Sequence, residues 1–171
     1  MNVDYVRQMA QTGDVLLVKG TSAEQHAIQI TCPPFCHVAQ LLRLPSGGLM
    51  VAEMLEPHGY QTMLFDDWLS GRLSDGDMIY FGQAPDVVRR GGQAIIDRQS
   101  HYLDPTLRKY DFAALPLVWL SRITGKEYPV NGEVCSLLVG DNWEAAGYPI
   151  HGNPSPGSFL EMCDSISYLR P

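Results

Sequence analysis

The sequence has no basic cluster and no long apolar run. Its 12 lysine and arginine residues are outnumbered by 19 aspartate and glutamate residues, so the formal net charge is -7 at pH 7. Nucleic acids and anionic membranes attract basic patches, and a membrane-spanning helix needs roughly 20 apolar residues. We therefore expect no nucleic-acid partner and no stable membrane insertion. Because the first residues lack the pattern of a signal peptide, we expect a cytoplasmic protein or one associated with a phage particle or virion.

Cysteines are few, and the pattern of a structural metal site is incomplete. The four are Cys32, Cys36, Cys135 and Cys163. A chain of this length does not need disulfides to hold its core, so we expect free thiols. Cys32, Cys36 and His37 could begin a zinc site, but a second pair of ligands is missing, and strand neighbours point to opposite faces. We expect neither a metal ion nor another cofactor.

Length and composition suit one α+β domain that spans residues 1–171. Of the 171 residues, 45% are hydrophobic, which is enough for one core. The apolar patterns predict strands mainly in the first half and helices mainly in the second, which indicates an antiparallel sheet or small barrel packed against helices. The predicted strands are residues 15–18, 36–44, 48–55, 61–64, 76–81 and 166–170. The predicted helices are residues 2–11, 66–69, 86–102, 112–123, the helix from its N-cap at residue 131 to about residue 145, and residues 158–163. Residues 27–30 fit either a strand or the end of a helix.

Two of the predicted strands form a hairpin that carries a histidine and a glutamate. Residues 36–44 and 48–55 are joined by a turn sequence rich in glycine and proline. If His37 and Glu53 are opposite or diagonal in register, the imidazole and the carboxylate meet, whereas a slip of one residue separates them. A carboxylate in an apolar strand is costly without a partner, which favours this pairing over a solvent-facing Glu53.

The segment from Asn131 to Gly140 predicts a helix with a cysteine in its first turn. Asn131 is a suitable N-cap, and Glu133 complements the helix dipole. The unpaired N–H groups at a helix start favour a thiolate, the nucleophilic form of cysteine, so Cys135 is a candidate nucleophile. The alternative is a small buried apolar residue, as most free cysteines are. Cys135, His37 and Glu53 together match the triad of cysteine hydrolases.

The order of short motifs along the chain resembles the circularly permuted papain-like hydrolases related to the NlpC-type cell-wall peptidases, the YiiX-like group. In ordinary papain-like enzymes the cysteine helix precedes the histidine strand, and in the permuted group it follows, as here. The motifs are Gly13-Asp14-Val15-Leu16-Leu17, His37-Val38-Ala39, Val51-Ala52-Glu53, Tyr110-Asp111-Phe112, Val134-Cys135-Ser136-Leu137-Leu138-Val139 and Ser155-Pro156-Gly157.

The resemblance implies Cys135 as nucleophile, His37 as general base and acid, and Glu53 as the residue that orients the imidazole. It implies a structural role for Gly13-Asp14 at the start of the first strand. The chain departs from the family at Cys36, where serine or threonine is common, and at Leu137, where an acidic residue is frequent.

The expected reaction is cleavage of an amide in a peptide-like substrate, including peptidoglycan fragments, through a thioester intermediate. The N–H of Cys135 would meet the oxyanion, with Tyr80 and Tyr110 as candidates for the second donor.

Two alternatives remain. The first is a thioesterase or acyltransferase for lipid-like acyl groups, of the lecithin:retinol-acyltransferase type, with an apolar groove walled by Leu64, Phe65, Trp68 and Met78. The second is a catalytically inactive binding or structural module on the same scaffold.

Overall fold

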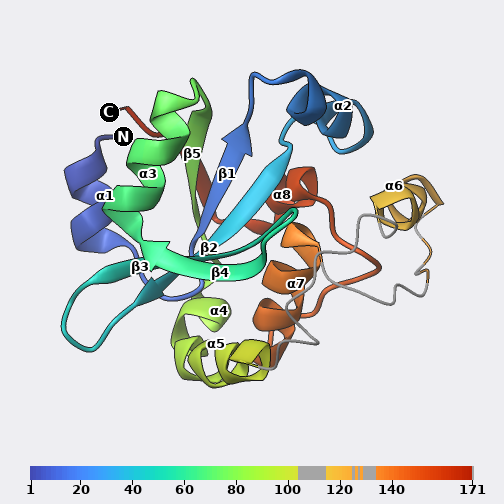
Figure 1. The fold of residues 1–171 in the computed structure, drawn as a ribbon. Helices are drawn as coiled ribbons and strands as arrows, with labels where there is room; N and C mark the ends of the chain where they lie inside the picture. Colours follow the sequence, from blue (N-terminus) through green and yellow to red (C-terminus); the bar gives the residue numbers. More distant parts are fainter. Residues whose placement is uncertain (104–114, 125, 127, 129–133, 171) are drawn as a thin grey trace.

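The computed structural model describes residues 1–103, 115–124, 126, 128 and 134–170 (Figure 1). Its elements are, in chain order, α1 (Val3–Met9), β1 (Val15–Lys19), α2 (Ala23–Thr31), β2 (His37–Arg43), β3 (Leu49–Leu55), β4 (Gly59–Leu64), α3 (Phe65–Ser74), β5 (Met78–Gln83), α4 (Asp86–Arg90), α5 (Gly92–Gln99), η1 (Ser100–Leu103), α6 (Leu115–Thr124), α7 (Cys135–Ala145), η3 (Pro156–Ser158), α8 (Phe159–Met162) and β6 (Ser165–Tyr168).

The strands form one sheet in the order β4-β3-β2-β1-β5-β6, and every neighbouring pair is antiparallel. β1 lies inside the sheet, and its first four residues are fully buried, as a continuous apolar strand requires. The fold is α+β. The two ends of the described chain lie side by side (Figure 1), where the Met1 amino group donates to the Tyr168 carbonyl.

The hairpin predicted around residues 36–55 is present. β2 and β3 pair in register from Gln40 opposite Ala52 to Arg43 opposite Leu49. The connecting turn closes through the N–H of Leu44, which donates to the Gly48 carbonyl at 2.9 Å. The register therefore follows from the turn and the alternating apolar residues.

Apolar residues pack on both faces of the sheet. On one face, alternate strand residues such as Leu16 and Val51 pack with α1 and α3. On the other face, their sequence neighbours Leu17 and Ala52 pack with α4, α5, α7 and α8. A strand that packs between two apolar layers needs apolar side chains on both of its faces. This is why apolar residues in β1 and β2 do not alternate strictly with polar ones.

Asp14, just before β1, is fully buried and joins this sheet to α4. Its carboxylate accepts hydrogen bonds from the N–H groups of Gln11 and Ala84, and it pairs with Arg89 at 2.8 and 2.9 Å. Gly13 precedes it with a φ of 102°, a conformation that favours glycine. These contacts support the structural role expected for this motif.

Of the two alternatives for residues 27–30, the structure shows the end of a helix. Residues 23–31 form this helix, because Ser22 and Gln25 make a capping box at its start. One segment differs from the prediction. The helix predicted over residues 86–102 is instead α4, α5 and η1, interrupted at Gly91. A side chain at Gly91 would lie 2.6 Å from the Ala146 carbonyl oxygen, so the close approach of α7 requires glycine there. Among the helices of the described chain, none is long and apolar enough to cross a membrane.

Candidate functional site

His37 and Glu53 meet on the hairpin of β2 and β3. His37 Nε2 and Glu53 Oε2 are 2.7 Å apart, and both side chains are buried. Continuing the register of the hairpin toward the start of β2 makes the two residues diagonal neighbours, which long polar side chains can span. The structure therefore brings together two of the three predicted site residues.

Glu53 is the centre of a buried hydrogen-bond network. Its Oε2 atom also accepts from Trp68 Nε1 at 2.9 Å and from Arg72 at 2.9 Å, and its Oε1 atom accepts from Gln61 Nε2 at 2.6 Å. Burial alone would raise the pKa of Glu53, but the hydrogen bonds from His37 and Trp68 and the positive charge of Arg72 lower it below its usual range. Glu53 is therefore an ionised carboxylate that only accepts hydrogen bonds.

The state of His37 follows from that of Glu53. An ionised carboxylate needs a donor, so Nε2 carries the proton of the shared hydrogen bond. Burial lowers the pKa of His37, although the hydrogen bond to Glu53 opposes this shift. His37 is thus neutral at pH 7, and its Nδ1 atom carries a lone pair that no described residue uses. The imidazole is thus the tautomer with the proton on Nε2 and none on Nδ1.

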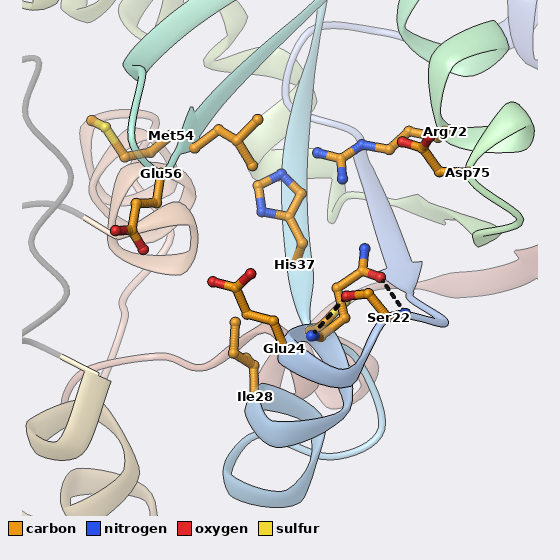
Figure 2. A pocket seen from close by; sticks show the side chains of 11 residues that line it. Ser22, Glu24, Ile28, His37, Met54, Glu56, Arg72 and Asp75 are labelled. Carbon is orange, nitrogen blue, oxygen red and sulfur yellow. Dashed lines mark hydrogen bonds between the residues drawn. The ribbon is translucent and has the colours of Figure 1, made fainter.

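His37 lies in the wall of a cavity of about 450 Å³ between α2, β2, β3 and α3. Figure 2 shows its ring in the middle of this cavity, between Arg72 and Asp75 on one side and Met54 and Glu56 on the other. The described residues that line it are Ser22, Glu24, Gln25, Ile28, Cys36, His37, Met54, Leu55, Glu56, Arg72 and Asp75. A substrate group in this cavity would reach the imidazole.

Cys135 lies in the first turn of a helix, as the sequence predicts, and is the first residue of α7. The N-cap of α7 is Val134, without a side-chain hydrogen bond. Asn131 and Glu133 lie outside the described residues. The thiol still has the position at a helix start that the prediction required.

The pKa of Cys135 contradicts the expected stabilisation of a thiolate. Only 3% of Cys135 is exposed, and it packs with Val38, Val139 and other apolar residues. This burial raises the pKa of the thiol to about 12, although the backbone amides of Val38 and Ser136 oppose the shift. The apolar surroundings disfavour the thiolate more strongly than the helix start favours it. Cys135 is therefore a protonated thiol in this structure.

No hydrogen bond joins Cys135 to His37 in the described part of the chain. Trp68 and Arg72, which donate to Glu53, come from α3 and Gln61 comes from β4, whereas Cys135 packs with Val38 in the cluster on the α7 side. Cys135 also does not line the cavity. The third predicted site residue therefore lies on the opposite face of the sheet from the pair and is not in contact with it.

Comparisons with known proteins were made for the sequence and for the fold. No family model matches the sequence, and a search of curated proteins found no match. The fold is similar to the crystal structure of metalloprotein YiiX from Escherichia coli O157:H7, with a TM-score of 0.57, 17% sequence identity, 80% of this chain covered and 66% of that chain covered.

The chain has a YiiX-like fold. The predicted resemblance to the permuted papain-like, NlpC-related fold is confirmed at the level of the fold. The matched part is just under two thirds of the length of YiiX.

YiiX is described as a metalloprotein, so we tested whether this chain could hold a metal ion. The described residues include no group of three or more histidine, cysteine, aspartate or glutamate side chains that could do so. Cys36 does not turn toward a metal site with His37, since its thiol donates to the Val18 carbonyl at 3.4 Å. The described residues do not fit a metal ion, and no step proposed below uses one.

The residues proposed as walls of an acyl groove lie apart from the cavity beside His37. Phe65 and Trp68 are core residues at 2% and 3% exposure, and Leu64 is exposed. None of these three, nor Met78, lines the cavity beside His37. Of the two tyrosines considered for the oxyanion, Tyr80 packs edge-on against Phe35, and Tyr110 lies outside the described residues.

Sequence reasoning missed Trp68 and Arg72 as partners of Glu53. They are four residues apart on α3, so they share one face of that helix. The Arg72 guanidinium also lies 5.3 Å from the centre of the Trp68 ring. One signal in the sequence could have indicated such partners. A carboxylate buried in an apolar strand is unfavourable without hydrogen-bond donors, so donors near Glu53 were to be expected. The sequence pattern of α3 alone, however, does not say which strand this helix covers.

Proposed function

We propose that the protein is a papain-like cysteine hydrolase that cleaves an amide bond in a peptide-like substrate, such as a peptidoglycan fragment. Cys135 is the nucleophile, His37 the general base and acid, and Glu53 the residue that orients His37. The observation that carries this proposal is the buried 2.7 Å bond between His37 and Glu53, which leaves Nδ1 free beside a cavity. The YiiX-like fold and the position of Cys135 at the start of α7 support it.

In this reaction His37 Nδ1 takes the proton from the Cys135 sulfur, and the thiolate attacks the amide carbon. The N–H of Cys135 donates to the resulting oxyanion. Collapse breaks the C–N bond, the amine leaves with the proton from His37, and a thioester forms on Cys135. Water, deprotonated by His37, then releases the acid. Glu53 stabilises the imidazolium in both halves of the reaction because its charge is already held next to Nε2.

The proton transfer requires the Cys135 sulfur to approach His37. In the structure the protonated thiol packs among apolar residues on the α7 face of the sheet, whereas the imidazole lies on the α3 face. The reactive pair therefore forms only with a rearrangement where α7 and β2 begin. The backbone amides of Val38 and Ser136 favour the thiolate once it forms. The neutral His37 with a free Nδ1 is the acceptor that this step needs.

The test is the rate of iodoacetamide alkylation of Cys135 against pH, resolved by site with mass spectrometry. We expect His37→Ala to slow the reaction at pH 7 by about tenfold or more, because the thiolate loses its imidazolium partner. The matched control is His58→Ala, which removes an exposed histidine outside the cavity and should leave the rate unchanged. Equal rates in the native protein and His37→Ala would overturn the proposal.

A second candidate is a binding module without catalysis, and the burial of Cys135 is the observation that favours it. A thiol with a pKa of about 12 has very little thiolate at pH 7 and so reacts slowly. Under this alternative all three proteins would show the same slow alkylation of Cys135, and the cavity beside His37 would bind a ligand without turning it over.

A further inference from the structure

A second cavity, of about 460 Å³, lies at the end of α1. Its walls come from the end of α1 and the loop that follows, from the last residue of β2, and from α4 and α5. His37 begins β2 and Arg43 ends it, so the two residues lie about 20 Å apart at the rise of a strand. This cavity is therefore separate from the one beside His37.

The walls of this second cavity are basic although the chain is acidic. The chain has 12 lysine and arginine residues against 19 aspartate and glutamate residues, yet three arginines line the cavity, Arg43, Arg89 and Arg90. None of the described residues that line it is an aspartate or a glutamate. Positive side chains around a concave wall focus their field on the space between them. The second cavity therefore attracts anions.

Arg43 supplies a charge that no carboxylate in the described part of the chain balances. Its guanidinium donates to main-chain carbonyls, those of Arg7, Ala10 and Gly47, at 2.6–3.0 Å. These bonds hold the end of α1 and fix the guanidinium in place, but neutral carbonyl groups do not cancel its charge. An anion in the cavity would thus meet a cation that is already positioned.

The other two arginines differ in how their charges are used. Arg89 pairs with the buried Asp14 carboxylate through two hydrogen bonds, so most of its charge is cancelled. Arg90 is exposed, and its ion-pair partner Asp86 is exposed as well and lies 3.8 Å away. A surface pair of this kind contributes little, so the Arg90 side chain can turn to a ligand without a large loss.

The remaining walls supply a hydrogen-bond donor and apolar surface. The buried Thr12 hydroxyl accepts from the Arg43 N–H at 2.9 Å, and its own proton has no acceptor among the described residues. Met9 and Ile96 also line the cavity and are 51% and 37% exposed, although both are apolar. A ligand with an oxyanion group and an apolar part would suit both kinds of wall.

We propose that this cavity binds a small organic anion. Its phosphate or carboxylate group would face Arg43 and Arg90, and its apolar part would contact Met9 and Ile96. The proposal goes beyond the proposed hydrolase function and does not depend on Cys135 or His37.

The test is titration with phenyl phosphate, inorganic phosphate and benzoate, followed by NMR of isotope-labelled methyl groups of Met9 and Ile96. The buffer contains about 0.1 M sodium chloride, so that charges more than about 10 Å away are screened. We expect phenyl phosphate to shift both signals to saturation and to bind about threefold or more tightly than inorganic phosphate, because its ring adds apolar contact. Tighter binding of phenyl phosphate than of benzoate assigns a phosphate ligand, and the reverse order assigns a carboxylate.

Three exposed positions provide matched variants, each of which lowers the net charge by one. Gln8→Glu and Arg90→Gln act in the cavity wall and should each weaken binding of the preferred probe by about threefold or more. The control His26→Glu lies on α2, away from α4 and α5 (Figure 1), and should leave the affinity within about twofold. No saturable shift of either methyl signal with any probe, or equal weakening by the control and the cavity variants, would overturn the proposal.

Discussion

The Nε2 atom of His37 lies 2.7 Å from Oε2 of Glu53, and the same oxygen accepts hydrogen bonds from Trp68 and Arg72. The imidazole is thus held by a carboxylate that is itself fixed from α3. This arrangement orients His37 before any substrate binds, because each donor restricts the rotation of the carboxylate.

Glu53→Gln should strongly destabilise the protein. The amide cannot accept all four hydrogen bonds as the carboxylate does, and it removes the closer of the two carboxylates that pair with the mostly buried Arg72, the other being Asp77 at 3.6 Å. We expect the free energy of unfolding, measured with urea, to fall by about 3–5 kcal/mol. The control variant Asp66→Asn removes an exposed carboxylate and should change the free energy of unfolding little. Similar losses in both variants would contradict this account.

Trp68→Phe tests the hydrogen bond to Glu53 without removing the ring. Because the acceptor is charged, we expect a loss of about 1.5–3 kcal/mol in the free energy of unfolding. Trp143→Phe removes a bond to the neutral Gly13 carbonyl and should cost about 0.5–1.5 kcal/mol. Urea unfolding of both variants gives the comparison, and a larger loss for Trp143→Phe would show that the network around Glu53 is weaker than its geometry indicates.

Acidification should destabilise the protein in two stages. The pKa of His37 is lowered by burial from its ordinary value of 6.5, so the unfolded chain binds a proton that the folded chain does not. The contribution of neutral His37 to the free energy of unfolding is therefore complete above about pH 6.5, and it is lost as the pH falls below that value. The pKa of Glu53 lies below its ordinary value of 4.5, because the bonds from His37 and Arg72 outweigh burial, so a further loss begins near pH 4.5.

The measurement is the urea midpoint from about pH 8 to pH 4. His37→Asn should remove the upper stage of the decrease, while His58→Asn should retain it. A native midpoint that does not change between about pH 7 and pH 5 would contradict the assignment of a neutral, buried His37.

Asp14→Asn should lower stability without a specific effect on the candidate site. The variant leaves Arg89 partly buried without its carboxylate, and we expect a loss of about 3–5 kcal/mol in the free energy of unfolding. Under conditions where the variant remains folded, the alkylation rate of Cys135 and its dependence on His37 should match those of the native protein. A loss of that dependence would indicate a role for Asp14 beyond structure.

The fold was predictable where local signals agree. The glycine-rich turn and the apolar strands on either side predict the hairpin, and its register brings His37 to Glu53. The helix beginning near Cys135 follows from apolar spacing in the same way. The break at Gly91 was not predictable, because it depends on the approach of Ala146 from a distant part of the chain.

The sequence by itself determined the α+β class, the hairpin with its histidine and glutamate, and the position of Cys135 at a helix start, because turn residues and apolar periodicity act over a few residues. Only the tertiary structure decided the protonation of Cys135 and the partners of Glu53. Burial and hydrogen bonding depend on which helix covers which face of the sheet, and that packing brings Trp68 and Arg72 to Glu53 while it surrounds Cys135 with apolar side chains.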